Sequence, residues 1–118
     1  MTADTITVRL ADHTYAHVRA GLCFGRVIEP QSVAALAVAR TAFHNATRRQ
    51  LVNGRGEGIV SWDVEMTVAD AITTGWLIRD RLSWPHDEAD YDAVSTFLRA
   101  LLIGLHGWVA TAPVEATA

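Results

Sequence analysis

The chain has no lysine, one cysteine and three prolines. The single cysteine, Cys23, excludes an internal disulfide framework and is typical of proteins from a reducing compartment. The apolar run at 100–105 is far shorter than the roughly 20 residues of a membrane-spanning helix. An acid at position 4 and the lack of an early apolar stretch argue against a secretory signal. We therefore expect a cytoplasmic protein that does not contact a membrane.

Half of the 118 residues are apolar, which is enough for one domain with its own core. We expect this α+β domain to span residues 1–110 and to be followed by a disordered C-terminal tail, 111–118. All ten basic residues are arginine, and alanine is abundant. This bias is typical of a GC-rich genome, such as that of a bacterium or one of its phages.

The net charge of −3 is unevenly distributed along the chain. Residues 1–56 contain seven arginines against three acids, a net +4, and residues 57–118 contain three arginines against ten acids, a net −7. Such asymmetry can indicate an anion-binding half, or two halves that attract each other within or between chains.

Alternating apolar residues predict two strands near the N-terminus. Ile6, Val8 and Leu10 alternate with polar residues, which is the period of a half-buried strand. After a turn at 11–14, a second alternation over 16–24 predicts a hairpin. A helix is the alternative for 14–24, because the spacing of apolar residues there also fits a helical period.

The rest of the chain predicts one more strand and three helices. An alanine-rich helix should begin after Pro30 and run from Val33 to about Leu51, with its first half deeply buried, until the glycines of 53–58 end it. Strict alternation over 60–68 predicts a strand, and helical spacing follows over 68–82. Residues 83–85 should break that helix, and residues 86–90 should begin the last one. The acids at the start of the last helix should stabilise it, because they lie near the positive N-terminal end of the helix dipole. The order β-β-α-β-α-α indicates a small antiparallel sheet with helices packed on one face.

The last helix carries an apolar seam at the spacing of helix–helix packing. Its members are Tyr91, Val94, Leu98, Leu101, Leu105 and Trp108, widened by Phe97, Leu102 and Val109. Either the rest of the domain or a second chain must cover so wide a face. We predict a small non-enzymatic protein–protein interaction or regulatory module that forms a homodimer through this helix. The predicted interface consists of Leu98, Leu101, Leu105 and Trp108, with Trp84 as an anchor in the preceding break.

Four arginines suggest an alternative function, the binding of an anion or a nucleic acid. Arg40, Arg48, Arg49 and Arg55 lie in a stretch without acids, next to a glycine-rich turn. On one helix, Arg40 and Arg48 would share a face. A solvated helix end explains the same residues, and the acidic net charge argues against a strong nucleic-acid binder.

A small-molecule site or an enzyme active site in a pocket between sheet and helices is a further alternative. Its reactive groups would come from His17, Cys23 and His44. His13 and His17 are four apart, a metal-binding spacing on a helix, but the predicted hairpin separates them. We therefore predict no metal site, no cofactor and no catalytic residue.

Overall fold

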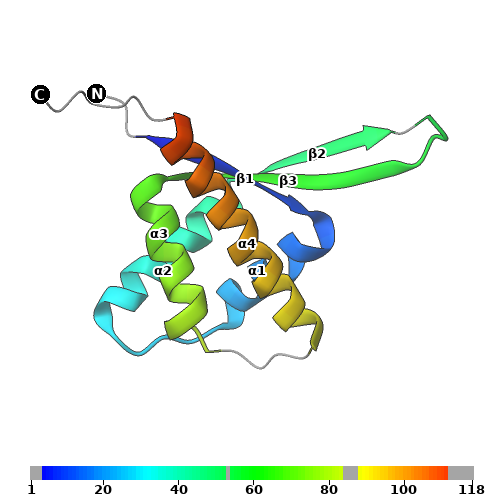
Figure 1. Ribbon diagram of the computed structural model, residues 1–118. Coiled ribbons are helices and arrows are strands. Elements are labelled where there is room, and N and C mark those ends of the chain that lie inside the picture. Colours follow the sequence, from blue (N-terminus) through cyan, green and yellow to red (C-terminus); the bar gives the residue numbers. More distant parts are fainter. Residues whose placement is uncertain (1–3, 53, 84–87, 112–118) are drawn as a thin grey trace, which may run out of the picture.

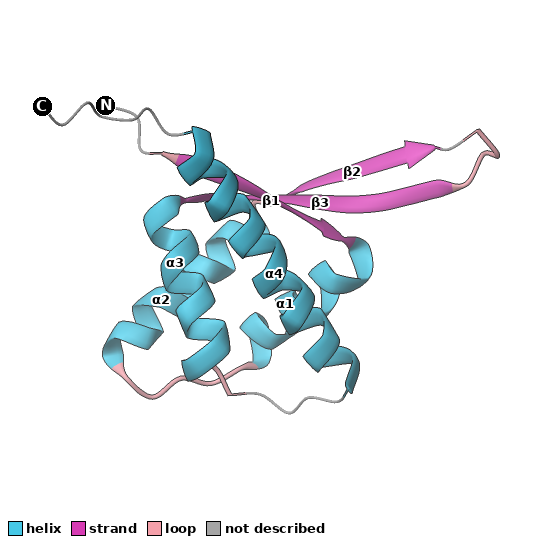
Figure 2. Cartoon of the chain, in the orientation of Figure 1, coloured by secondary structure: helices cyan, strands magenta, loops and turns pink. Residues whose placement is uncertain are grey.

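The computed structural model describes residues 4–52, 54–83 and 88–111. In chain order the elements are β1 (Thr5–Ala11), α1 (Asp12–Phe24), α2 (Pro30–His44), β2 (Thr47–Val52), β3 (Gly58–Thr67), α3 (Val68–Trp76), the π-helical segment η1 (Leu77–Arg81) and α4 (Glu88–Thr111). The strands form one antiparallel sheet in the order β1-β3-β2, and the helices lie against one of its faces (Figures 1 and 2). The predicted α+β class is confirmed.

The two predicted strands at 5–10 and 60–68 pair with each other. Val8 lies opposite Val64, and Ile6 opposite Met66, so their side chains point to the same face of the sheet. All four side chains are buried, while Thr5, Thr7 and Glu65 on the other face are exposed. The alternation predicted from the sequence is therefore the alternation between the helix-covered face and the open face.

The predicted hairpin at the N-terminus is wrong, because residues 12–24 form helix α1. Tyr15, Val18 and Leu22 are buried, at the helical spacing that the sequence offered as the alternative. The apparent alternation depended on Ala16 and Ala20, which are exposed in α1. Alanine favours a helix and is depleted in strands, which explains the outcome.

The predicted helix over 33–51 ends earlier, at His44, and the chain then returns as strand β2. Pairing with β3 supplies the hydrogen bonds of this segment, a tertiary effect that local propensity does not contain. The first half of α2 is also less buried than predicted. Val33 is 54% and Val38 is 40% exposed, so only one side of the helix faces the core.

The predicted helix over 68–82 is present as α3 followed by η1. Thr67 caps α3, because its hydroxyl accepts a hydrogen bond from the Asp70 amide at 3.1 Å. Helix α4 runs from Glu88, with Glu88 and Asp90 in its first turn, to Thr111, the first residue of the predicted tail. Residues 86 and 87 of the predicted helix start lie outside the described residues. Residues 112–118 lie outside the described residues.

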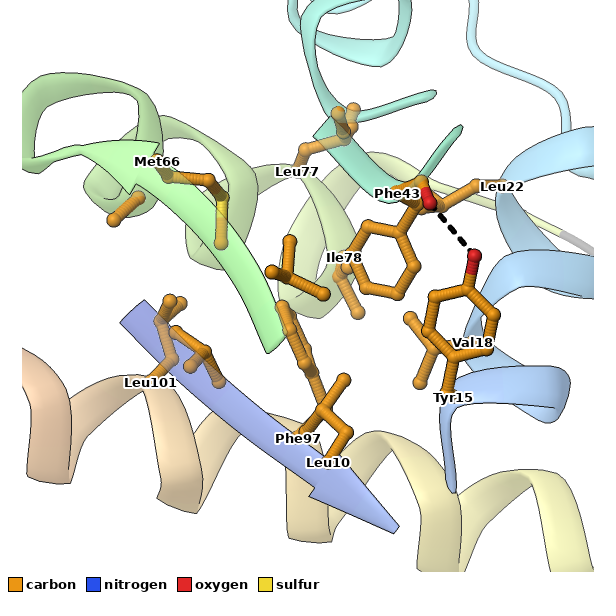
Figure 3. Packing of buried hydrophobic residues seen from close by; sticks show 14 of the residues in the cluster. Leu10, Tyr15, Val18, Leu22, Phe43, Met66, Leu77, Ile78, Phe97 and Leu101 are labelled. Atoms are coloured by element: carbon orange, nitrogen blue, oxygen red, sulfur yellow. Dashed lines mark hydrogen bonds between the residues drawn. The ribbon is translucent and has the colours of Figure 1, made fainter. Parts of the chain in front are cut away.

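The element order therefore differs from the predicted β-β-α-β-α-α in its first half, where two helices separate β1 from the β2–β3 hairpin. The core contains a row of aromatic rings that joins four elements. Trp62 of β3 stacks on Tyr15 of α1 at 4.1 Å, Tyr15 stacks on Phe43 of α2 at 5.5 Å, and Phe43 meets Phe97 of α4 edge-on at 5.5 Å. Figure 3 shows the hydroxyl of Tyr15 donating to the Phe43 carbonyl, at 2.7 Å.

Candidate functional site

An apolar groove of about 460 Å³ lies between α3 and α4. Its lining residues are Ala71, Ile72, Gly75, Trp76, Arg79, Leu98, Leu101, Leu102 and Leu105. The helices approach closely at Gly75, where an added methyl group would lie 3.0 Å from Cδ2 of Leu101. Ala71 and Gly75, which present only a methyl group and a hydrogen atom, line the groove on α3, and leucines of α4 line the opposite side.

Helix α4 divides its apolar residues between two stripes. Ala93, Phe97 and Leu101 are buried against the body of the domain. Leu102 is 67% exposed and Val109 is 63% exposed, and they lie on a second stripe with Leu98 and Leu105, which are partly buried. The domain therefore covers one stripe of α4 completely and leaves the second stripe open along the groove.

Three of the five predicted interface residues line this groove: Leu98, Leu101 and Leu105. Leu101 is only 3% exposed, so its side chain already belongs to the core of its own chain. Trp108 is partly buried against the core cluster, and Trp84 lies outside the described residues. The predicted seam thus contains residues of both stripes.

Sequence reasoning did not place Ile72 in the interface and treated Leu102 only as a widening of the seam. Both are more than half exposed in the groove. The helical spacing of Leu98, Leu102 and Leu105 was visible in the sequence. Which of two adjacent stripes stays uncovered depends on the position of α3, which local spacing does not reveal.

Charged residues lie at one end of the groove. The Arg79 guanidinium binds the carboxylate of Asp80 at 2.9 Å, and its hydrogen bonds hold the pKa of Asp80 below the ordinary value. Arg81 lies 5.2 Å from the ring centre of Trp76 and also binds Glu29 at 2.9 Å. These contacts leave the middle of the groove apolar.

The four predicted anion-binding arginines do not form one cluster. Arg40 lies on α2 and donates to the carbonyls of Leu22 and Cys23 at 2.6 and 3.2 Å, where it satisfies the C-terminal end of α1. The expectation that Arg40 and Arg48 share a helix face is wrong, because Arg48 lies on β2. Arg48 and Arg49 point to opposite faces of that strand, and Arg55 lies in the turn that follows it.

Arg49 takes part in an ion-pair network on the open face of the sheet. Arg9 of β1 and Arg49 of β2 both donate to the carboxylate of Asp63 on the central strand, from Arg9 at 2.9 Å. Hydrogen bonds from Arg9 and from Arg49 hold the pKa of Asp63 below its ordinary value, although partial desolvation opposes the shift. The network carries a net charge of +1 when all three groups are ionised.

The residues of the predicted small-molecule site are only partly brought together. Cys23 and His44 line one hollow of about 310 Å³ beside Arg40, and Cys23 is exposed. His17 lies elsewhere and binds Asp90 of α4 at 2.6 Å. His13 and His17 do share a helical face, with ring centres 4.4 Å apart, contrary to the predicted hairpin. Within the described residues, no group of three potential metal ligands forms.

Comparison of the chain with protein-family models, curated proteins and solved structures finds no match. Within residues 4–52, 54–83 and 88–111, every helix is too short or too polar to cross a bilayer.

Proposed function

We propose that this protein is a non-enzymatic protein–protein interaction module that associates with a second copy of itself through α4 and the α3–α4 groove. The observation that carries the proposal is the open apolar stripe of α4, in which Leu102 is 67% exposed beside Ile72 at 58%. Soluble surfaces rarely expose a contiguous set of large apolar side chains unless a partner covers it.

The spacing of the open stripe favours another helix as the occupant. Counting from Tyr91, the apolar members Leu98, Leu102, Leu105 and Val109 follow at intervals of seven, four, three and four. This is the heptad spacing of a helix that packs lengthwise on another helix. From Tyr91 to Val109 the stripe is about 27 Å long, at a rise of 1.5 Å per residue.

The spacing of the stripe favours a second copy of α4 as that helix. When two copies pack antiparallel around a two-fold axis between Leu102 and Leu105, Leu102 of one copy lies opposite Leu105 of the other, and Leu98 lies opposite Val109. The apolar pattern of the stripe is therefore complementary to itself.

Sedimentation equilibrium over a range of concentrations tests this proposal. We expect a dimer that resists high salt, because apolar contacts dominate the stripe and salt screens only interactions between charges. Leu102→Asp should shift the protein to monomer, because it places a charge in the centre of the contact. Leu101 is not suitable for this test, since it is buried within its own chain.

Leu51→Asp is the matched control, because Leu51 is exposed to a similar extent, 62%, on β2. This variant should dimerise like the unmodified protein. A protein that stays monomeric at high micromolar concentration would contradict the proposal. So would a Leu51→Asp variant that dissociates while Leu102→Asp remains dimeric.

A further inference from the structure

The β2–β3 hairpin forms an arm that extends past the layer of helices (Figure 1). We define the arm as residues 47–60, of which all but Asn53 are described. All six residues of β2 are exposed, and so are Gly58 and Ile59 of β3. Because β1 flanks β3 as far as Ser61, Arg48 and Arg49, which lie opposite Trp62 and Ser61, are at the base of the arm. Beyond them the described residues of the arm form two paired strands with no third strand beside them.

The charge of the arm is opposite to that of the rest of the chain. It contains three arginines against one glutamate, a net +2, so that the remaining residues carry −5. A projecting basic element on an acidic protein attracts an anionic partner to that element and away from the body.

The basic side chains of the arm point in several directions. Arg48 is on the face turned toward the helices, beside Gln50, to which it donates at 3.4 Å. Arg49 is on the open face, oriented by Asp63. Arg55 is exposed in the turn between Gly54 and Gly56, and the positive φ of Gly56, 79°, allows that tight reversal.

This arrangement disfavours pairing with a second copy along the free edge of β2. If the β2 strands of two copies paired antiparallel over most of their length, Arg48 and Arg49 would lie directly or diagonally opposite arginines of the other copy. Like charges at such positions repel each other. An added acidic peptide strand would meet the edge of β2 but not the turn that holds Arg55. Neither occupant uses all three cations.

A groove of double-stranded DNA does use them, because phosphates line both of its walls. The major groove of B-form DNA admits a two-stranded β-ribbon, and arginine and glutamine are the side chains that pair with guanine and adenine edges. We propose that the β2–β3 arm enters a groove of duplex DNA, with Arg55 contacting phosphates or bases inside the groove, Gln50 contacting a base edge, and Arg48 and Arg49 at the base of the arm contacting phosphates at the rim.

Fluorescence anisotropy with a labelled duplex of about 20 base pairs tests this proposal, at about 50 and 200 mM salt. With three cations engaged, the logarithm of the association constant should fall with the logarithm of salt concentration at a slope of about −3. Arg48→Glu and Arg55→Glu should each weaken binding about tenfold and reduce the slope by about 1.

Arg26→Glu is the matched control, because Arg26 is an exposed arginine in the connection between α1 and α2 and the substitution changes the charge equally. It should change the affinity less than twofold, and circular dichroism should show all three variants folded. The Leu102→Asp variant should still bind as a monomer, which separates this proposal from self-association.

Four results would overturn the proposal. The duplex could fail to bind at low salt, or Arg26→Glu could weaken binding as much as the arm variants do. Polyglutamate could displace the duplex at equal charge concentration, which would indicate an acidic protein partner. A labelled single strand of the same length could bind more tightly than the duplex.

Discussion

The two ends of β3 have similar residues and different surroundings. On the face of β3 turned toward the helices, Val64 and Met66, at the end paired with β1, are 0% and 4% exposed, whereas Val60 is half-buried and Gly58 is exposed at the arm end. Both ends are paired to a neighbouring strand in an antiparallel register. The difference comes from the helices, which cover the first end and stop short of the second. In this protein, backbone pairing and core formation are thus separable along a single strand.

The boundary between the two regions lies at Trp62. Its ring stacks on Tyr15, and its indole N–H donates to the Asp12 carboxylate at 2.7 Å. These contacts attach the base of the arm to the first turns of α1. Beyond Trp62, the side chains of the arm have no helix above them.

The strongest test of the comparison is a large-to-small change on each side of this boundary. Phe43→Ala removes a ring that is 1% exposed and contacts the rings of both Tyr15 and Phe97, and we expect a loss of about 3–5 kcal/mol in the free energy of unfolding. Val52→Ala in the arm, on the same face of the sheet as Val64 and 67% exposed, should cost less than about 0.5 kcal/mol, as is usual for exposed positions. Urea denaturation measures both, and equal losses would show that the arm is packed.

Glycine positions provide a second, smaller contrast. A methyl group on Gly25 would lie 2.4 Å from the Gly21 carbonyl oxygen and 2.5 Å from Cδ1 of Leu82. Gly25→Ala should therefore destabilise the protein by about 1–3 kcal/mol. Gly54 in the arm has open space around it, so Gly54→Ala should leave the melting temperature nearly unchanged. A larger shift for Gly54→Ala than for Gly25→Ala would contradict this difference between the body and the arm.

The smallest expected effect concerns Asp63, which joins the arm strand β2 to β1 through two arginines. Because the pKa of Asp63 is lowered in the folded protein, its ionised form stabilises the fold above the ordinary value of about 3.9. That contribution should be lost as the pH falls past 3.9 and through the lowered pKa. Asp63→Asn should flatten the dependence of unfolding free energy on pH in this window, with little change in slope above pH 5. An unchanged acid limb would show that other carboxylates determine it.

The sequence correctly predicted the segments whose apolar residues fit only the period of a strand. The strict alternations of β1 and β3 allowed no helical interpretation, and both strands lie where expected. Residues 14–24 fitted two periods, and the helix forms because Tyr15 and Leu22 pack into the core and because alanine favours a helix. The end of α2 was missed because Arg48, Arg49 and Gln50 are good helix formers, and their strand conformation depends on pairing with β3.

The candidate sites show the same difference between what local sequence spacing predicts and what tertiary packing decides. Spacing alone identified an apolar seam on the last helix, yet of the neighbouring residues Leu101 and Leu102 the first is 3% exposed and the second is 67% exposed. The position of α3 at Gly75 decides which of them is covered. The sequence predicted Arg40 and Arg48 on one face of a helix, because it predicted a helix throughout residues 33–51. On a strand, consecutive residues alternate, so Arg48 and Arg49 separate.

The packing of α4 against β1 has a consequence for synthesis. A methyl group on Gly104 would lie 3.4 Å from Cδ1 of Ile6, so one of the last helical turns covers the first strand. On the ribosome, Ile6 is synthesised 98 residues before Gly104, so β1 exists long before that cover does. The apolar side of β1 is therefore partly uncovered and accessible to chaperones and to other nascent chains until α4 has emerged.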